Sequence, residues 1–224
     1  MEGKQKLTPL LLLFLAVELV LYYLILTAGG NLLRWSSYIA IVLCFLYSAI
    51  HCHRSNWQLV GGLFFTVCAD FCLVICQPIQ QLWGMVFFLC AQTLYCRHLH
   101  HKNANKLMLT IRMFLIGTAI LICFIVLKKK TDALAVISIC YYAHLIMNIV
   151  DSTLGRKRCP LLPAAFILFI LCDTVIGLQV MSSGYIPISQ ESILHKILFC
   201  NFNLSWLFYL PSQVLIAISS HKQK

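Results

Sequence analysis

The sequence predicts an all-α integral membrane protein whose helices form one transmembrane bundle. Hydrophobic residues make up 61% of the 224 positions, whereas charged residues make up only 11%. A soluble domain carries about 25% charged residues and cannot bury so much apolar surface. Apolar runs of about 20 residues also recur along the whole chain, and in lipid a run of that length must satisfy its own backbone hydrogen bonds as a helix.

Eight apolar runs approach the length that spans a bilayer. In chain order they cover residues 8–28, 35–50, 57–76, 82–99, 107–127, 131–150, 161–181 and 199–219. The second run is short, and the last contains several polar residues. Because the connections are too short for a separate soluble domain, residues 1–224 are expected to form a single polytopic domain.

The first run is interpreted as a retained helix rather than a cleaved signal peptide. It follows only a short basic start, Lys4 and Lys6, and it lacks a small-residue cleavage site. It also continues into further spans, which a signal peptide does not.

The distribution of Lys and Arg predicts the orientation. An even number of spans places both termini on one side, and that side collects most of the basic residues, including Arg156–Arg158, so both termini are expected in the cytoplasm. The run Lys128–Lys130 argues against this orientation. Arg112 lies near the start of the fifth run and is expected to snorkel. The net charge of +10 then indicates attraction to anionic headgroups, and no nucleic-acid partner is expected.

Two aspartates lie deep inside predicted spans. Asp70 follows Trp57 by 13 residues and Asp173 follows Leu161 by 12, which places each about 18–20 Å into its helix. A carboxylate in mid-bilayer costs about 2.5–3.5 kcal/mol on insertion scales, so such residues usually mark a polar functional site. With eight spans, the third and seventh run in the same direction, and the two aspartates are expected at nearly equal depth.

The spans that follow each aspartate also share a pattern, in which aromatic residues precede a lone glutamine. Gln92 occupies this position in the fourth span and Gln213 in the eighth. The matched features predict a repeat of four plus four spans, and such repeats commonly place a site at their shared interface. Chance similarity between hydrophobic helices is the alternative.

Further polar residues are candidates for the same centre or for interhelical hydrogen bonds. Tyr141, His144, Asn148 and Asp151 form one stripe of the sixth span, and Trp206, Tyr209 and Gln213 share a face of the eighth. Glu18 is intramembrane as well. The patches His51–His53 and His98–His101 have ligand atoms for a metal, but their spacing matches no known zinc motif, so no metal is predicted.

These residues resemble the YhhN-type lysoplasmalogenase family. The resemblance rests on Gly62 through Asp70 and Leu73, on Gly84 through Gln92 and Tyr95, and on a C-terminal part with Phe169 through Thr174, Trp206, Tyr209, Gln213 and Ile216 through Ser219. Two positions depart from the pattern: the family often has histidine where this chain has Gln92, and a Lys-Pro pair where Arg34-Trp35 stands here.

The resemblance implies hydrolysis of the vinyl ether bond of alkenyl lysophospholipids to a fatty aldehyde and a glycerophospho-alcohol. Asp70 and Asp173 would act as the acid and base, one as a neutral carboxylic acid and the other as a carboxylate. The side chains expected to bind the substrate are Gln92, Tyr95, Tyr209, Gln213, Tyr141, His144 and Asn148. No cofactor is required, and the partners are a lysophospholipid and the bilayer.

Two other functions fit the intramembrane carboxylates. A transporter could use them for substrate or proton coupling, and a non-catalytic membrane scaffold could use them as buried structural partners. The spans contain few Gly or Pro interruptions of the kind that make discontinuous transport helices, Pro211 being the main one. The membrane is expected to be the plasma membrane in a bacterium or an endomembrane such as the endoplasmic reticulum in a eukaryote.

Overall fold

The computed structural model of the chain describes residues 9–52, 56–103, 106–127, 132–154, 160–184, 192–200 and 202–220, and its elements are all helices. In chain order they are α1 (Pro9–Thr27), α2 (Gly30–His51), α3 (Trp57–Asp70), the π-helix η2 (Phe71–Ile75), α4 (Gln81–Asn103), α5 (Lys106–Leu127), α6 (Ala133–Leu154), α7 (Leu162–Gly184), α8 (Ile193–Leu198) and α9 (Leu204–Ser219). The prediction of an all-α protein is confirmed.

Five stretches of the described chain are long and apolar enough to cross a membrane. They are α1, α2, α3 continued through η2, α6 and the part of α7 up to Val180, while α9 is a shorter apolar helix. The chain is therefore a multi-pass membrane protein. The run Lys128–Lys130, which bears on the predicted orientation, lies outside the described residues.

The second and the last predicted spans begin about five residues away from the helices that the structure has there. The second helix begins at Gly30 rather than at residue 35, because Gly30 adopts a φ of +61° and the chain reverses direction there. The last predicted run, 199–219, is helical only in its later part. The short helix α8 ends at Leu198, just before that run, its start capped by the Ser192 side chain, which accepts a hydrogen bond from the Leu194 amide, and α9 starts only at Leu204.

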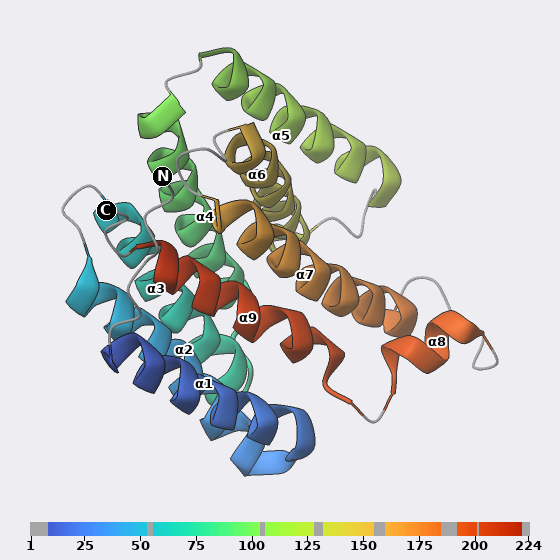
Figure 1. The fold of residues 1–224 in the computed structure, drawn as a ribbon. Coiled ribbons are helices and arrows are strands. Elements are labelled where there is room, and N and C mark those ends of the chain that lie inside the picture. Colours follow the sequence, from blue (N-terminus) through green and yellow to red (C-terminus); the bar gives the residue numbers. More distant parts are fainter. Residues whose placement is uncertain are drawn as a thin grey trace.

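Successive long helices run in alternating directions, so that the start of α1 and the end of α9 lie at the same end of the bundle (Figure 1). The packing order in the first half, α1 on α2, α2 on α3 and α3 on α4, recurs in the second half as α5 on α6, α6 on α7 and α7 on α9. Contacts of α4 with α6 and of α2 with α9 join the halves, and α5 lies at the periphery against α6.

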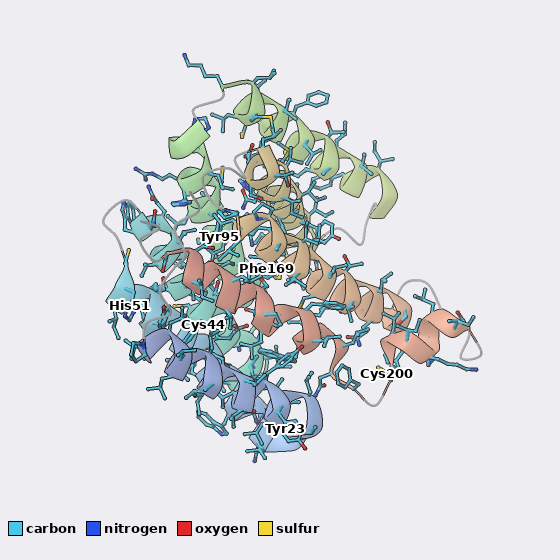
Figure 2. All side chains as sticks on the ribbon, in the orientation of Figure 1. Tyr23, Cys44, His51, Tyr95, Phe169 and Cys200 are labelled. Atoms are coloured by element: carbon cyan, nitrogen blue, oxygen red, sulfur yellow. The ribbon has the colours of Figure 1, made fainter. Side chains whose placement is uncertain are left out.

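Glycines allow the closest helix contacts in the first half. A Cβ atom on Gly62 would lie 2.1 Å from Cε1 of Tyr95, and one on Gly84 would lie 2.5 Å from Cγ of Leu73. Small residues at such positions let helices in lipid approach closely. Figure 2 shows Tyr95 and Phe169 inside the bundle, where both are fully buried, whereas Tyr23 is at the periphery.

Candidate active site

Asp70 is the last residue of α3 and is buried in the bundle. Its side chain is 3% exposed, and its Oδ2 accepts a hydrogen bond of 2.7 Å from the hydroxyl of Tyr209 on α9. Tyr209 is itself buried. Asp70 and Tyr209 are 139 residues apart in the sequence, so the contact links the first half of the bundle to the last helix.

Asp173 on α7 has a similar partner from the neighbouring helix. Its Oδ2 accepts a hydrogen bond from the hydroxyl of Tyr141 on α6, and one residue further along each helix Tyr142 and Thr174 share a hydrogen bond of 2.8 Å. Asp173 is less enclosed than Asp70, since part of its surface stays exposed. Each aspartate is therefore held by a tyrosine from a different helix.

Two phenylalanine rings connect the tyrosines that hold the aspartates. The ring centroid of Phe88 lies 5.8 Å from that of Tyr141 and 6.3 Å from that of Tyr209. Phe169 lies 6.4 Å and 5.4 Å from the same two rings. These separations are typical of favourable aromatic pairs. Because each of these tyrosines donates to one aspartate, the structure brings both aspartates to one aromatic cluster.

The helix that carries Asp70 changes geometry directly after it. Residues Phe71–Ile75 form a π-helix, in which the Cys76 amide donates to the Phe71 carbonyl over 2.9 Å. Arg34 on α2 holds the end of this turn, because its guanidinium donates to the carbonyls of Val74 and Ile75 over 3.0 and 2.8 Å. π-turns of this kind occur frequently at functional sites. Arg34, one of the departures from the family pattern, thus stabilises the segment after Asp70.

Arg112 does not snorkel, and this expectation is wrong. The side chain is 1% exposed and lies against α6, where it donates to Nδ1 of His144 at 3.0 Å, to Oδ1 of Asn148 at 2.9 Å and to Oδ2 of Asp151 at 2.6 Å. Three of the four residues in the stripe predicted on the sixth span therefore bind a cation from α5, while the fourth, Tyr141, binds Asp173. Desolvation explains the geometry, because a guanidinium inside an apolar bundle needs a counter-ion and hydrogen-bond acceptors.

The Arg112 network extends to Gln92. The Nδ2 of Asn148 donates to the backbone carbonyl of Gln92 at 3.0 Å and to its Oε1 at 2.8 Å. Both side chains are completely buried. His144 and Asn148 accept from Arg112, and Asn148 donates to Gln92, so these hydrogen bonds link the three residues to Arg112 rather than to Asp70 or Asp173. That His144, Asn148 and Gln92 bind the substrate stays a prediction.

Of the remaining predicted residues, Tyr95 and Gln213 are buried near the residues of the cluster, whereas Glu18 is buried away from them. Tyr95 is buried with its hydroxyl 3.5 Å from that of Thr66, one turn before Asp70. Gln213 is buried one turn after Tyr209, and its Oε1 has no hydrogen-bond partner among the described residues. Glu18 lies apart on α1, where Oε1 receives a 3.6 Å contact from the Cys44 thiol.

The described residues contain no group of three or more His, Cys, Asp or Glu side chains that could hold a metal ion. His53 and the side chain of His101 lie outside the described part of the chain. The arrangement at Asp70 and Asp173 therefore offers carboxyl groups, phenols and aromatic rings.

Comparison with protein-family models gives a match to the YhhN family over residues 32–220. The chain belongs to the YhhN family. The resemblance drawn from the sequence is confirmed, and the matched region includes both aspartates and both of their tyrosines. No curated protein and no solved structure matches the chain.

Sequence reasoning missed three features of this YhhN protein. Phe88 and Phe169 fall within the family pattern, but nothing in a single sequence indicates that they touch the same two tyrosines. Arg112 was placed at the surface, although a stripe with Asn148 and Asp151 on one face of a buried helix needs a donor, and this was the signal that could have found it.

Proposed function

We propose that this YhhN protein hydrolyses the vinyl ether bond of alkenyl lysophospholipids within the membrane. The observation that carries the proposal is the cluster in which Asp70 and Asp173, each bound by a tyrosine, meet around Phe88 and Phe169. Family membership supports it, because the YhhN-type pattern implies lysoplasmalogenase chemistry. An apolar, ring-lined site between helices also suits a substrate whose tail stays in the bilayer.

The reaction needs two carboxyl groups in different protonation states. One aspartic acid gives its proton to the β-carbon of the vinyl ether, and the π electrons form the new C–H bond. This leaves an oxocarbenium ion, which the other aspartate stabilises as a carboxylate. Water attacks the α-carbon, and its proton passes to that carboxylate. As the hemiacetal C–O bond breaks, this second aspartic acid gives its proton to the leaving glycerol oxygen and the hemiacetal hydroxyl gives its proton to the first aspartate, which releases aldehyde and alcohol and restores both carboxyl groups. Water is the only co-reactant, and no cofactor is used.

In this proposal Tyr209 and Tyr141 orient the carboxyl groups, and Phe88 and Phe169 present ring faces to the developing cation. An aromatic face attracts a cation, and the attraction grows when water is excluded. The proposal includes eight spans, namely α1, α2, α3 with η2, α4, α5, α6, α7 and α9, arranged as two related halves with both termini cytoplasmic. The alternating helix directions and the recurring packing order support this topology.

The test is hydrolysis of a 1-alkenyl lysophospholipid by purified protein in lipid nanodiscs, performed in D₂O with a hydrazine present to trap the aldehyde. Protonation at the β-carbon predicts an aldehyde with one deuterium next to the carbonyl carbon. Asp70→Asn and Asp173→Asn are expected to abolish turnover. Asp132→Asn is the matched control, because Asp132 is exposed and caps the start of α6 through the Ala135 amide, which asparagine also does.

Full activity in both aspartate variants would contradict the mechanism. A product without deuterium at that carbon would contradict the protonation step. Uptake of lysolipid or protons into sealed vesicles without cleavage would instead favour the transporter that the sequence left open.

A further inference from the structure

The side-chain amide of Gln92 is buried, and only its oxygen has a hydrogen-bond partner among the described residues. Its Oε1 accepts from Asn148, while its Nε2 has no hydrogen-bond partner among the described residues, and the residue is 0% exposed. A buried donor left without a partner costs about 1–3 kcal/mol. Native proteins retain such groups mainly where a ligand or water completes the bond.

The polarity of this amide is determined by Arg112. A guanidinium only donates, so the Asn148 atom that contacts it must be the carbonyl oxygen. The other end of the Asn148 amide must then be the NH₂ group, and the Gln92 atom facing it must be oxygen. The chain of bonds from Arg112 therefore fixes Nε2 of Gln92 as a buried donor that faces away from Asn148 and cannot exchange places with Oε1 without breaking a buried hydrogen bond.

The position of Gln92 relates this donor to the aspartate cluster. Gln92 lies one helical turn after Phe88, about 6 Å along α4, and Phe88 contacts both tyrosines that hold the aspartates. From Gln92 the helix continues to Arg97, so this positive charge on α4 lies beyond the amide along the helix. A lysolipid with its vinyl ether at the cluster and its headgroup toward the end of α4 that carries Arg97 places its glycerol near Gln92.

We propose that Nε2 of Gln92 binds the free sn-2 hydroxyl of the lysophospholipid, and that the Arg112–Asn148 pair holds the amide in the orientation this requires. The assignment rests on the proposed function, since it takes the substrate from there. Only two carbons separate the ether oxygen from that hydroxyl. The short separation between these two groups of the lipid is consistent with the one helical turn between Phe88 and Gln92. A phospholipid acylated at sn-2 has no hydroxyl there and carries extra bulk, so the same contact selects lyso substrates.

The experiment compares a 1-alkenyl lysophospholipid with its 2-deoxy analogue, which lacks only the hydroxyl. The wild-type protein is expected to favour the hydroxyl substrate by about tenfold or more in kcat/KM, because the analogue leaves a buried donor unpaired. Gln92→Met removes the donor at similar volume and is expected to reduce the preference to within about threefold. Asn148 keeps a partner in this variant, since it also donates to the backbone carbonyl at position 92.

Gln92→His is expected to retain the preference. A neutral imidazole accepts from Asn148 at one nitrogen and donates from the other, as the amide does. Thr93→Val is the matched control on the same helix, because Thr93 is exposed and its hydroxyl donates only to the Leu89 carbonyl. An unchanged preference in Gln92→Met, or no preference in the wild type, overturns the assignment.

A binding measurement separates this inference from the proposed function. Saturated 1-alkyl lysophospholipids, with and without the sn-2 hydroxyl, cannot be cleaved by the proposed route, and their affinities are measured by titration into nanodiscs. If vinyl ethers are not cleaved but the hydroxyl still improves binding about tenfold only when Gln92 is present, the reaction is wrong and the recognition stands. If cleavage occurs and the hydroxyl has no effect on binding, the recognition is wrong and the reaction stands.

Discussion

Removing the carboxylate that pairs with Arg112 is expected to destabilise the whole bundle. The change is Asp151→Leu, which leaves a guanidinium that is 1% exposed without its counter-ion at 2.6 Å. Breaking a buried ion pair on one side costs about 3–5 kcal/mol. The Asp151 side chain is 13% exposed, so water screens part of the interaction and the lower end, about 3 kcal/mol, is expected.

The assay is thermal unfolding of the purified protein in detergent. For a chain of this size about 3 kcal/mol corresponds to a fall in Tm of about 6–12 °C. Asp132→Asn, at an exposed helix start, is expected to leave Tm unchanged. The double variant Arg112→Met with Asp151→Leu removes both charges and is expected to unfold at a higher temperature than Asp151→Leu alone.

The double variant is not expected to reach the wild-type Tm, because Asn148 loses the donor to its Oδ1. The interaction free energy between positions 112 and 151, taken from the double-mutant cycle, should nevertheless exceed about 1.5 kcal/mol. Destabilisations that simply add in the double variant would refute the reasoning, since independent sites are additive and paired buried charges are not.

Two further predictions concern the first half of the bundle. Gly62→Ala is expected to lower the free energy of unfolding by about 1–3 kcal/mol through overpacking, because the new Cβ meets the Tyr95 ring at 2.1 Å. The measurement is its Tm compared with that of Gly117→Ala, where nothing lies within 4 Å of the new Cβ. An equal Tm for the two glycine variants would contradict this. Arg34→Met is expected to lower kcat/KM for vinyl ether hydrolysis more than Arg34→Lys, which can still bond one of the carbonyls of Val74 and Ile75; identical kinetics for both variants would show that the turn after Asp70 does not depend on that side chain.

The helical class and most helix bounds were predictable because hydropathy and span length depend only on local sequence. The same holds for the polar stripe of α6, since helical periodicity places Asn148 and Asp151 on one face whatever they contact. Periodicity does not identify a partner on another helix. Arg112 therefore looked like a residue near a membrane surface, although the bundle binds it internally.

The partner of Asp70 shows the same limit more clearly. Tyr38 precedes Asp70 by 32 residues, the same separation as Tyr141 and Asp173. A repeat of the two halves would pair Tyr38 with Asp70. The hydrogen bond comes instead from Tyr209 on α9. Which tyrosine donates to Asp70 depends on how helices distant in the sequence pack, and this cannot be inferred from a local sequence pattern.

Arg34 also has a consequence for the electric potential around Asp70. The aligned peptide dipoles of a helix leave about half a unit of negative charge at its carboxyl end. The stretch from Trp57 to Ile75 ends a little more than one turn after Asp70, so this negative end lies near the buried carboxyl group. The guanidinium of Arg34, bonded to the last carbonyls, supplies a full positive charge at that point. Position 34 thus contributes to the electrostatic field at the aspartate without touching it, and a neutral residue there would change that field while leaving the hydrogen bond from Tyr209 to Asp70 in place.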